Sequence, residues 1–182
     1  MTWRLSHRSD PVAAAIADRH YNRQHVGSPQ FVAPGRCLVL LHDSPALWVT
    51  SWPFAEYVKH AWAGAMVCSA FRNEGVALSS TLILEAVAVT RWRWPNVPAL
   101  GMVTFVNRDK VRPKRDPGFC FLRAGFVNVG ETKGGLVALQ LLPDAWPQAL
   151  EPEPMTGPSD QGRHVTADGM IWPPPSLPTE PL

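Results

Sequence analysis

This 182-residue sequence has few cysteines, no long apolar run and no large excess of charge of either sign. The three cysteines, Cys37, Cys68 and Cys120, lie far apart and form no Cys-x-x-Cys pair, which favours reduced thiols in a cytoplasm and argues against a zinc site. No run of about 18 apolar residues is present, so we expect no membrane span. The first residues carry charges but no apolar core, so we expect no signal peptide.

The bulk composition fits one domain followed by a tail. The net charge of +2 does not by itself indicate nucleic acid, and a hydrophobic content of 46% is enough for a core. From Pro143 the composition changes, and eight of the nineteen prolines fall in residues 151–182. We therefore predict a domain at residues 1–142 and a Pro-rich tail at residues 143–182, partly disordered or draped on the domain.

The stretch from residue 66 to residue 130 is predicted to form the functional centre. Met66 to Phe71 is a short apolar run typical of a central strand, and the turn formers Arg72 to Gly75 follow it. A helical period begins at Leu82, with Ser80 or Thr81 as the expected N-cap. A loop that feeds a helix N-terminus offers free backbone N–H groups to an anion.

Other elements follow from their capping residues and apolar patterns. We expect an early helix over residues 11–20, capped by Asp10 or Ser9 and with Pro11 in its first turn. The remaining expected strands are a hairpin of residues 36–42 and 46–52, a buried strand over 100–106, a strand toward Val129 and Gly130, and a last strand over 136–142.

The order of these elements resembles the acyl-CoA N-acyltransferase (GNAT) superfamily. Arg72-Asn-Glu-Gly75-Val-Ala77 follows the spacing of that family's pyrophosphate loop, with Ala77 in place of the second glycine. Phe121-Leu-Arg-Ala-Gly125-Phe126 is similar to the family's Tyr-x-x-x-Gly-Phe turn. The resemblance implies an α/β (α+β) fold: a mixed, mostly antiparallel central sheet flanked by helices on both faces.

The same resemblance implies that acetyl-CoA is the cofactor. The residues expected to bind it are Phe71, Arg72, Asn73, Glu74, Gly75, Val76, Ala77, Ser79 and Ser80. The family often places a tyrosine general acid where this chain has Phe121, which holds no ionisable proton. Cys120 is adjacent but lies in an apolar run typical of packing, so a proton donor is expected elsewhere.

A narrower resemblance starts at His20-Tyr-Asn-Arg23, which is similar to a His-Tyr-Ser-Arg motif of the Mom family of phage DNA-modification proteins. Segments resembling that family's later motifs follow in the same order up to Thr132, but Asn107 stands where the family has an aspartate. The resemblance implies transfer of an acetyl-CoA-derived group, a carbamoylmethyl, to adenine N6 in double-stranded DNA. It also implies location in the cytoplasm, that of a bacterial host if a phage encodes the chain. The catalytic candidates are His20, Tyr21, Arg23, Ser79 and Asp109.

A metal ion is an option that this resemblance leaves open. Iron is the metal it implies, with His20 and Tyr21 as the candidate ligands. Imidazole and phenol groups serve equally as a base or an acid, so a role in proton transfer remains the alternative.

Basic residues cluster before the short helix, where five of the eight residues from 108 to 115 are Lys or Arg. The residues expected to contact DNA phosphates are Arg91, Arg93, Arg108, Lys110, Arg112, Lys114 and Arg115. The alternatives are a solvated loop or a site for the 3′-phosphate of CoA. Three hypotheses therefore stand: a Mom-like DNA-modifying enzyme, an acetyl-CoA-dependent N-acetyltransferase of a small amine or a protein, and a non-catalytic nucleic-acid-binding module.

Overall fold

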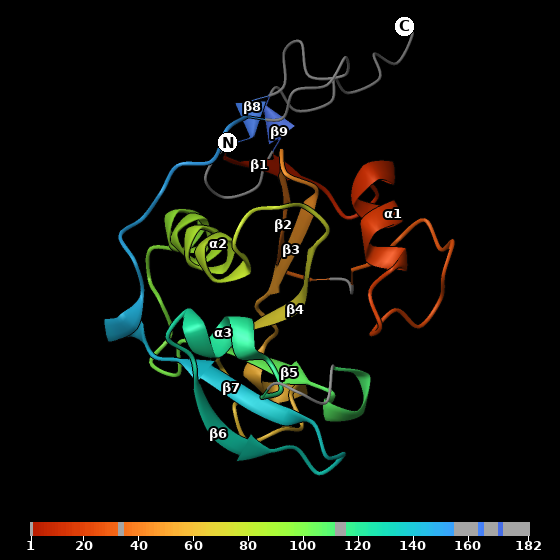
Figure 1. The fold of residues 1–182 in the computed structure, drawn as a ribbon. Coiled ribbons are helices and arrows are strands. Elements are labelled where there is room, and N and C mark those ends of the chain that lie inside the picture. The colour runs from red at the N-terminus through yellow and green to blue at the C-terminus, as the bar shows by residue number, and fades with distance from the viewer. Residues whose placement is uncertain (1, 33–34, 112–115, 155–163, 166–170, 173–182) are drawn as a thin grey trace, which may run out of the picture.

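A mixed α/β arrangement is seen in the computed structural model, which describes residues 2–32, 35–111, 116–154, 164–165 and 171–172 (Figure 1). Seven strands form one sheet in the order β1-β2-β3-β4-β5-β7-β6, and every neighbouring pair is antiparallel except β4 and β5. The prediction of a mixed, mostly antiparallel sheet is thus confirmed. No helix in the described ranges is both long and apolar enough to cross a membrane.

The elements of the sheet and its helices have the following bounds. The strands are β1 (Trp3–Ser6), β2 (Cys37–His42), β3 (Ala46–Ser51), β4 (Met66–Asn73), β5 (Met102–Val106), β6 (Val127–Glu131) and β7 (Val137–Leu141). The α-helices are α1 (Pro11–Asp18), α2 (Ser79–Arg93) and α3 (Phe119–Arg123). Short 3-10 turns are η1 (Ala55–Tyr57), η2 (Arg108–Lys110) and η3 (Pro143–Ala145), and β8 (His164–Val165) pairs with β9 (Ile171–Trp172).

The parallel pair β4–β5 stays together for only three residues of each strand. Met66 to Cys68 pair with Met102 to Thr104, and the pairing ends there although both strands continue. β4 also contains a bulge: Cys68 pairs with Thr50 and Ala70 with Val49, which leaves Ser69 as the extra residue. The two strands therefore part at their C-terminal ends. In a parallel pair these ends lie at the same edge of the sheet, so the side chains that follow them come close together.

Two hydrophobic clusters pack against alternating residues of β2. Leu38 and Leu40 belong to the larger cluster, together with Leu82, Ile83 and the following buried residues of α2. Val39 and Leu41 belong to a second cluster with Ala13, Ile16 and Ala17 of α1. Both helices are thus fixed to the sheet by buried apolar side chains.

The ends of the helices test the predicted capping. Asp10 caps α1 as predicted, since its carboxylate accepts from the backbone N–H groups of Val12 and Ala13. The predicted cap of α2 is wrong, because the N-cap residue is Leu78, which offers no side-chain hydrogen bond. β4 also runs two residues further than expected, so that Arg72 and Asn73 lie in the strand and not in a turn.

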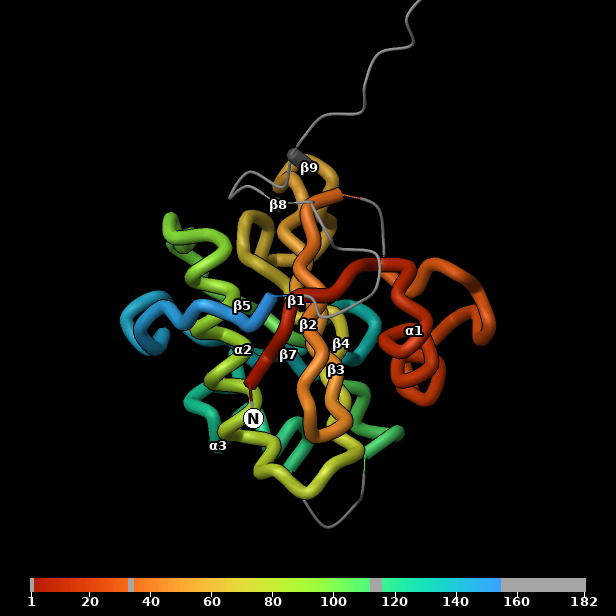
Figure 2. The backbone as a smooth tube through the Cα atoms, turned by 90° about the horizontal axis from the view of Figure 1, so that it is seen from above, coloured from red at the N-terminus to blue at the C-terminus, as the bar shows by residue number. Residues whose placement is uncertain are grey.

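The segment after β7 folds back over the domain (Figure 2). Trp146 is 5% exposed within the main cluster, and its Nε1 donates to the carbonyl of Leu141 at 3.1 Å. Further on, Glu153 exchanges backbone hydrogen bonds with β1, donating to Trp3 and accepting from Leu5. β1 itself was not foreseen, because four residues give too short a pattern to identify a strand.

Candidate functional site

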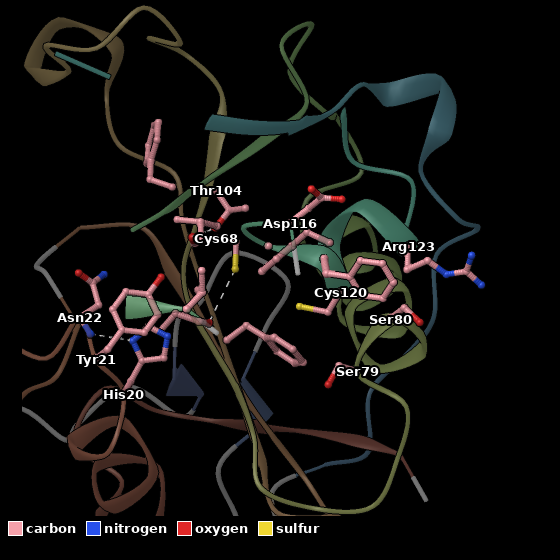
Figure 3. A pocket seen from close by; sticks show the side chains of 18 of the residues that line it. His20, Tyr21, Asn22, Cys68, Ser79, Ser80, Thr104, Asp116, Cys120 and Arg123 are labelled. Atoms are coloured by element: carbon pink, nitrogen blue, oxygen red, sulfur yellow. Dashed lines mark hydrogen bonds between the residues drawn. The ribbon is translucent and has the colours of Figure 1, made fainter. Parts of the chain in front are cut away.

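A pocket of about 640 Å³ lies where β4 and β5 part. It is lined by the ends of both strands, the start of α2, the helix α3 and the three residues His20 to Asn22 that follow α1. Figure 3 shows His20, Tyr21 and Asn22 on one side of the pocket and Ser79, Ser80 and Arg123 on the other. The sequence motif His20-Tyr21 and the expected start of α2 therefore meet in space.

The segment His20 to Asn22 fits against the edge of β4 that β5 has left. The Asn22 side chain donates to the carbonyl of Ser69 at 3.5 Å, and the rings of His20 and Tyr21 stack with centroids 4.6 Å apart. Ser69 is the bulged residue of β4, so the bulge presents the carbonyl that Asn22 binds. Both rings belong to residues that line the pocket.

His20 is a neutral hydrogen-bond donor in this arrangement. Its Nδ1 accepts the backbone N–H of Asn22 at 3.1 Å, so the neutral ring carries its proton on Nε2. Burial, and next the positive charge of Arg72, lower the pKa of His20, while a backbone hydrogen bond to Phe71 opposes them. The neutral ring therefore lacks a free lone pair, and its one N–H group is engaged by the backbone of Phe71.

This tautomer does not suit the predicted metal role. A neutral histidine that binds a metal through Nε2 must carry its proton on Nδ1, and that nitrogen here accepts the N–H of Asn22. Within the described ranges, no group of three or more His, Cys, Asp or Glu residues is placed to hold a metal ion. In this tautomer His20 offers no free lone pair to a metal ion.

Tyr21 keeps its proton over the physiological range. Burial raises the pKa of the phenol, the neighbouring thiols of Cys68 and Cys120 add to this, and a backbone hydrogen bond from Asn107 partly opposes the rise. Asn107 follows the end of β5, so Tyr21 reaches across the gap from the β4 side. A protonated phenol at this point can donate a hydrogen bond or a proton to a group in the pocket.

The two cysteines of the pocket are thiols and not nucleophiles. Cys68 is 3% exposed, and burial raises its pKa far above the ordinary value. Burial also raises the pKa of Cys120. Because the thiolate is the reactive form, both side chains serve as packing in the wall, as the apolar run around Cys120 suggested.

The start of α2 supplies backbone donors to the opposite wall. Ser79 and Ser80 are its first two residues and both line the pocket, while the N-cap Leu78 gives no side chain to their N–H groups. The Asn73 side chain donates to the Ser79 hydroxyl at 3.0 Å and to the Ala77 carbonyl at 2.7 Å, which fixes the incoming loop. This helix N-terminus is therefore open toward the pocket for an anionic group.

The loop before α2 is partly committed to internal contacts. The N–H of Glu74 donates to the Pro45 carbonyl, and the N–H of Gly75 donates to the Asn73 side chain. A Cβ on Gly75 would lie 1.8 Å from Oγ of Ser44, so close packing on the β2–β3 turn explains why this residue is glycine. Asn73, Glu74, Gly75, Val76 and Ala77 do not line the pocket, whereas the predicted Phe71, Ser79 and Ser80 do.

Glu74 instead joins α1 to β4. Its carboxylate accepts from Arg19 at 2.6 Å and from Arg72 at 2.5 Å, and these two hydrogen-bonded partners hold its pKa at about 2. Arg19 immediately precedes His20 in the chain. The Arg19–Glu74–Arg72 cluster therefore ties the motif segment to the end of β4.

Two predicted catalytic residues lie outside this pocket. Arg23 bonds Asp18 at 2.6 Å and the carbonyl of Ser28, so its guanidinium stabilises the loop after α1. Asp109 is exposed on η2, where its N–H donates to the Asn107 side chain. Asn107, which replaces the expected aspartate, thus caps that short turn.

Three of the predicted phosphate-binding cations make contacts within the protein. Arg91 donates to the carbonyls of Trp146 and Pro147, Arg93 lies 5.8 Å over the Trp94 ring, and Arg108 pairs with Glu131. Lys110 is exposed on η2. The last three of these predicted cations, Arg112, Lys114 and Arg115, lie outside the described residues.

Several pocket residues were not among the predicted site residues. Thr104 donates to the Cys68 carbonyl at 3.1 Å and marks the last pair of the two strands. Asp116 and Arg123 bring a negative and a positive charge to the pocket, and Phe105 and Phe119 bring further rings. Asn22, Thr104, Phe105 and Phe119 stand within motifs of the resemblance but were not predicted as site residues, and nothing in the local pattern marks Arg123 as one.

Comparison with known proteins adds no further assignment. No protein-family model, no curated protein and no solved structure matches this chain.

Proposed function

We propose that this protein is a GNAT-type transferase that moves an acetyl-CoA-derived group to an exocyclic amine of a base in DNA, with adenine N6 as the acceptor. The observation that carries the proposal is the parting of β4 and β5 after three residue pairs, with a pocket at the gap and the open N-terminus of α2 facing it. These three features together resemble the acyl-CoA site of the GNAT superfamily.

The packing of the helices agrees with that fold. Successive residues of a strand point to opposite faces of a sheet. Because α1 packs with Val39 and Leu41 while α2 packs with Leu38 and Leu40, the two helices lie on opposite faces, as Figure 2 also suggests. This supports the expected arrangement of helices on both faces.

The residues of the pocket suit the binding of a thioester. Backbone N–H groups of Ser79 and Ser80 offer donors to the pyrophosphate, and Arg123 adds a cation at the same wall. The mostly apolar lining of β4, β5 and α3 suits the pantetheine arm. Acetyl-CoA would supply the activated carbonyl; the chain supplies its orientation.

His20 and Tyr21 suit the two polar tasks of the transfer. To donate to the carbonyl oxygen as that oxygen gains charge, the Nε2–H of His20 would exchange its hydrogen bond to the Phe71 backbone for one to the substrate. If the group moved is the acetyl group itself, the amine would form its bond to the acyl carbon as the carbon–sulfur bond breaks, and Tyr21 would give its proton to the departing thiolate. The proton that the amine releases returns to Tyr21, which takes the place of the family's tyrosine at Phe121.

A planar acceptor fits the rings of the pocket better than a flexible aliphatic amine. His20 and Tyr21 stack on each other, and Phe71, Phe105 and Phe119 also line the pocket. Enzymes that act on a base commonly hold it between aromatic side chains after it has left the stack. This observation favours a nucleobase over the small-amine alternative.

Nucleoside mass spectrometry of plasmid DNA from expressing cells tests the proposal. The chain has two tyrosines, so Tyr21→Phe can be compared with Tyr57→Phe, which alters an exposed residue outside the pocket. We expect a new adenine-derived mass with the unaltered protein and with Tyr57→Phe, and at least a tenfold smaller yield with Tyr21→Phe because general acid catalysis contributes about 10²–10⁴-fold.

Unmodified DNA would contradict the proposal. Binding of acetyl-CoA, measured by calorimetry on the same folded protein, would then favour an N-acetyltransferase of small amines or proteins. Binding of DNA without acetyl-CoA would favour the non-catalytic module.

A further inference from the structure

The segment between β3 and β4 carries an unusual number of rings at the surface. Within residues 52–62 lie Trp52, Phe54, Tyr57, His60 and Trp62. Phe54 is 58% exposed and Tyr57 is 75% exposed, so these two large rings meet solvent. Exposed aromatic side chains gathered in one segment indicate an interaction site.

Cations accompany these rings. The Arg36 guanidinium lies 5.4 Å from the centre of the Trp52 ring and 5.4 Å from that of Phe54, and the Phe54 and Tyr57 rings meet edge to face. Lys59 is exposed in the same segment, and Glu56 is its one acid. In the described part of the chain, no carboxylate lies within ion-pair distance of Arg36 or Lys59.

The segment continues to the pocket. The His60 ring lies 4.9 Å and the Trp62 ring 5.8 Å from the Phe105 ring, and Phe105 lines the pocket. The register of the strands shows on which face of the sheet Phe105 meets these two rings.

Val103, two residues before Phe105, pairs with Val67, which pairs with Ser51. Ser51 lies two residues after Val49, which packs with α1, so Phe105 lies on the same face of the sheet as α1. Phe105, which His60 and Trp62 contact, therefore borders the pocket on the face of the sheet that α1 covers.

We propose that Arg36, Trp52, Phe54, Tyr57 and Lys59, here called the aromatic–cation surface, bind single-stranded DNA and lead an unpaired base toward the pocket. The inference rests on the proposed function for the fate of that base. Exposed rings give stacking platforms to bases, and nearby cations meet the phosphates. A duplex hides the faces of its bases, so this surface favours an unpaired strand.

Fluorescence anisotropy with a labelled adenine-rich oligonucleotide tests the surface, using the strand alone and the strand annealed to its complement. We expect the single strand to bind more tightly than the duplex and the affinity to fall as salt is raised. Phe54→Ala and Tyr57→Ala should each weaken binding about fivefold or more, because stacking contributes about 1–3 kcal/mol per base.

Matched variants separate stacking and charge from general effects. Tyr57→Phe keeps the ring and should bind as the unaltered protein does. Lys59→Ala should weaken binding, whereas Lys133→Ala, which removes an exposed cation between β6 and β7, should not. Equal affinity for duplex and single strand, or alanine variants that bind like the unaltered protein, would overturn the inference.

The same proteins assayed for DNA modification distinguish this inference from the proposed function. If single-stranded DNA binds in a way that depends on Phe54 and Tyr57 but no base is modified, the binding role of the aromatic–cation surface is supported and the transferase function is rejected. Modified DNA whose yield and affinity are unchanged by the alanine variants supports the transferase and overturns the surface.

Discussion

Trp146 allows a sharp test of where the folded domain ends. Its side chain is 5% exposed and packs in the same cluster as residues of β1, α2 and β7, although it lies beyond the predicted boundary at residue 142. We compare Trp146→Ala with Leu150→Ala, whose side chain is 41% exposed. A chain that ends after Leu142 is compared in the same way with one that ends after Pro154.

The expected loss of stability follows from burial. Replacing a buried tryptophan by alanine costs about 3–5 kcal/mol, and the lost hydrogen bond to Leu141 adds about 1 kcal/mol. The free energy of unfolding of a domain is about 5–15 kcal/mol, so this is a large part of it. Ending the chain after Leu142 also removes the backbone hydrogen bonds of Glu153 to β1 and of Leu150 to Ala88.

Thermal unfolding followed by circular dichroism measures these differences. At about 2–4 °C per kcal/mol for a chain of this size, Trp146→Ala should lower the Tm by about 10 °C or more. Leu150→Ala should stay within about 0.5 kcal/mol of the unaltered protein. A Tm shift below about 3 °C for Trp146→Ala, or equal stability of the two shortened chains, would refute the reasoning from burial.

Three further outcomes follow from other residues. Gly118 has φ +71°, and a Cβ there would lie 2.4 Å from Leu139 Cδ1. Gly118→Ala should therefore lower the free energy of unfolding, measured with urea, by about 2–4 kcal/mol. The control Gly134→Ala should lower it by less than about 1 kcal/mol. The pKa of Glu74 lies below its ordinary 4.5, at about 2, so its stabilisation is present above pH 4.5 and is lost as the pH falls toward 2. After allowance for solvent screening this amounts to about 1 kcal/mol, which Glu74→Gln should remove from the acid dependence of unfolding. Cys68, whose pKa burial raises, should resist alkylation until the protein unfolds, as mass spectrometry would show.

The strongest local signals in the sequence predicted the elements well. Asp10 followed by Pro11 predicted the start of α1, and the apolar runs around the Asp43-Ser44-Pro45 turn predicted β2 and β3 to within one residue at each end. Such signals succeed because the residues concerned act on their immediate neighbours. The resemblance in motif order named His20, Tyr21 and Ser79 as site residues, and the structure places these three in the lining of one pocket.

Contacts between distant residues account for what the sequence did not reveal. The N-cap of α2 was misplaced because the helix begins earlier than its hydroxyl residues indicated: the predicted caps Ser80 and Thr81 lie within its first turn, and the N-cap is the apolar Leu78. Arg91 is basic and lies near tryptophans, yet it binds the carbonyls of Trp146 and Pro147. The spacing of residues 72–77 placed Glu74 in a cofactor-binding loop, but its carboxylate forms an ion pair with Arg19, which is distant in the sequence.

The contact between Glu153 and β1 has a consequence for how the protein is made. β1 precedes the other described strands in this sequence, yet the backbone hydrogen bonds that Glu153 makes with it come from a residue about 150 positions further along the chain. Until then the nascent chain presents an uncovered strand edge, which invites pairing with other chains. Synthesis paused before Glu153 would therefore leave this edge of β1 open to pairing with other chains.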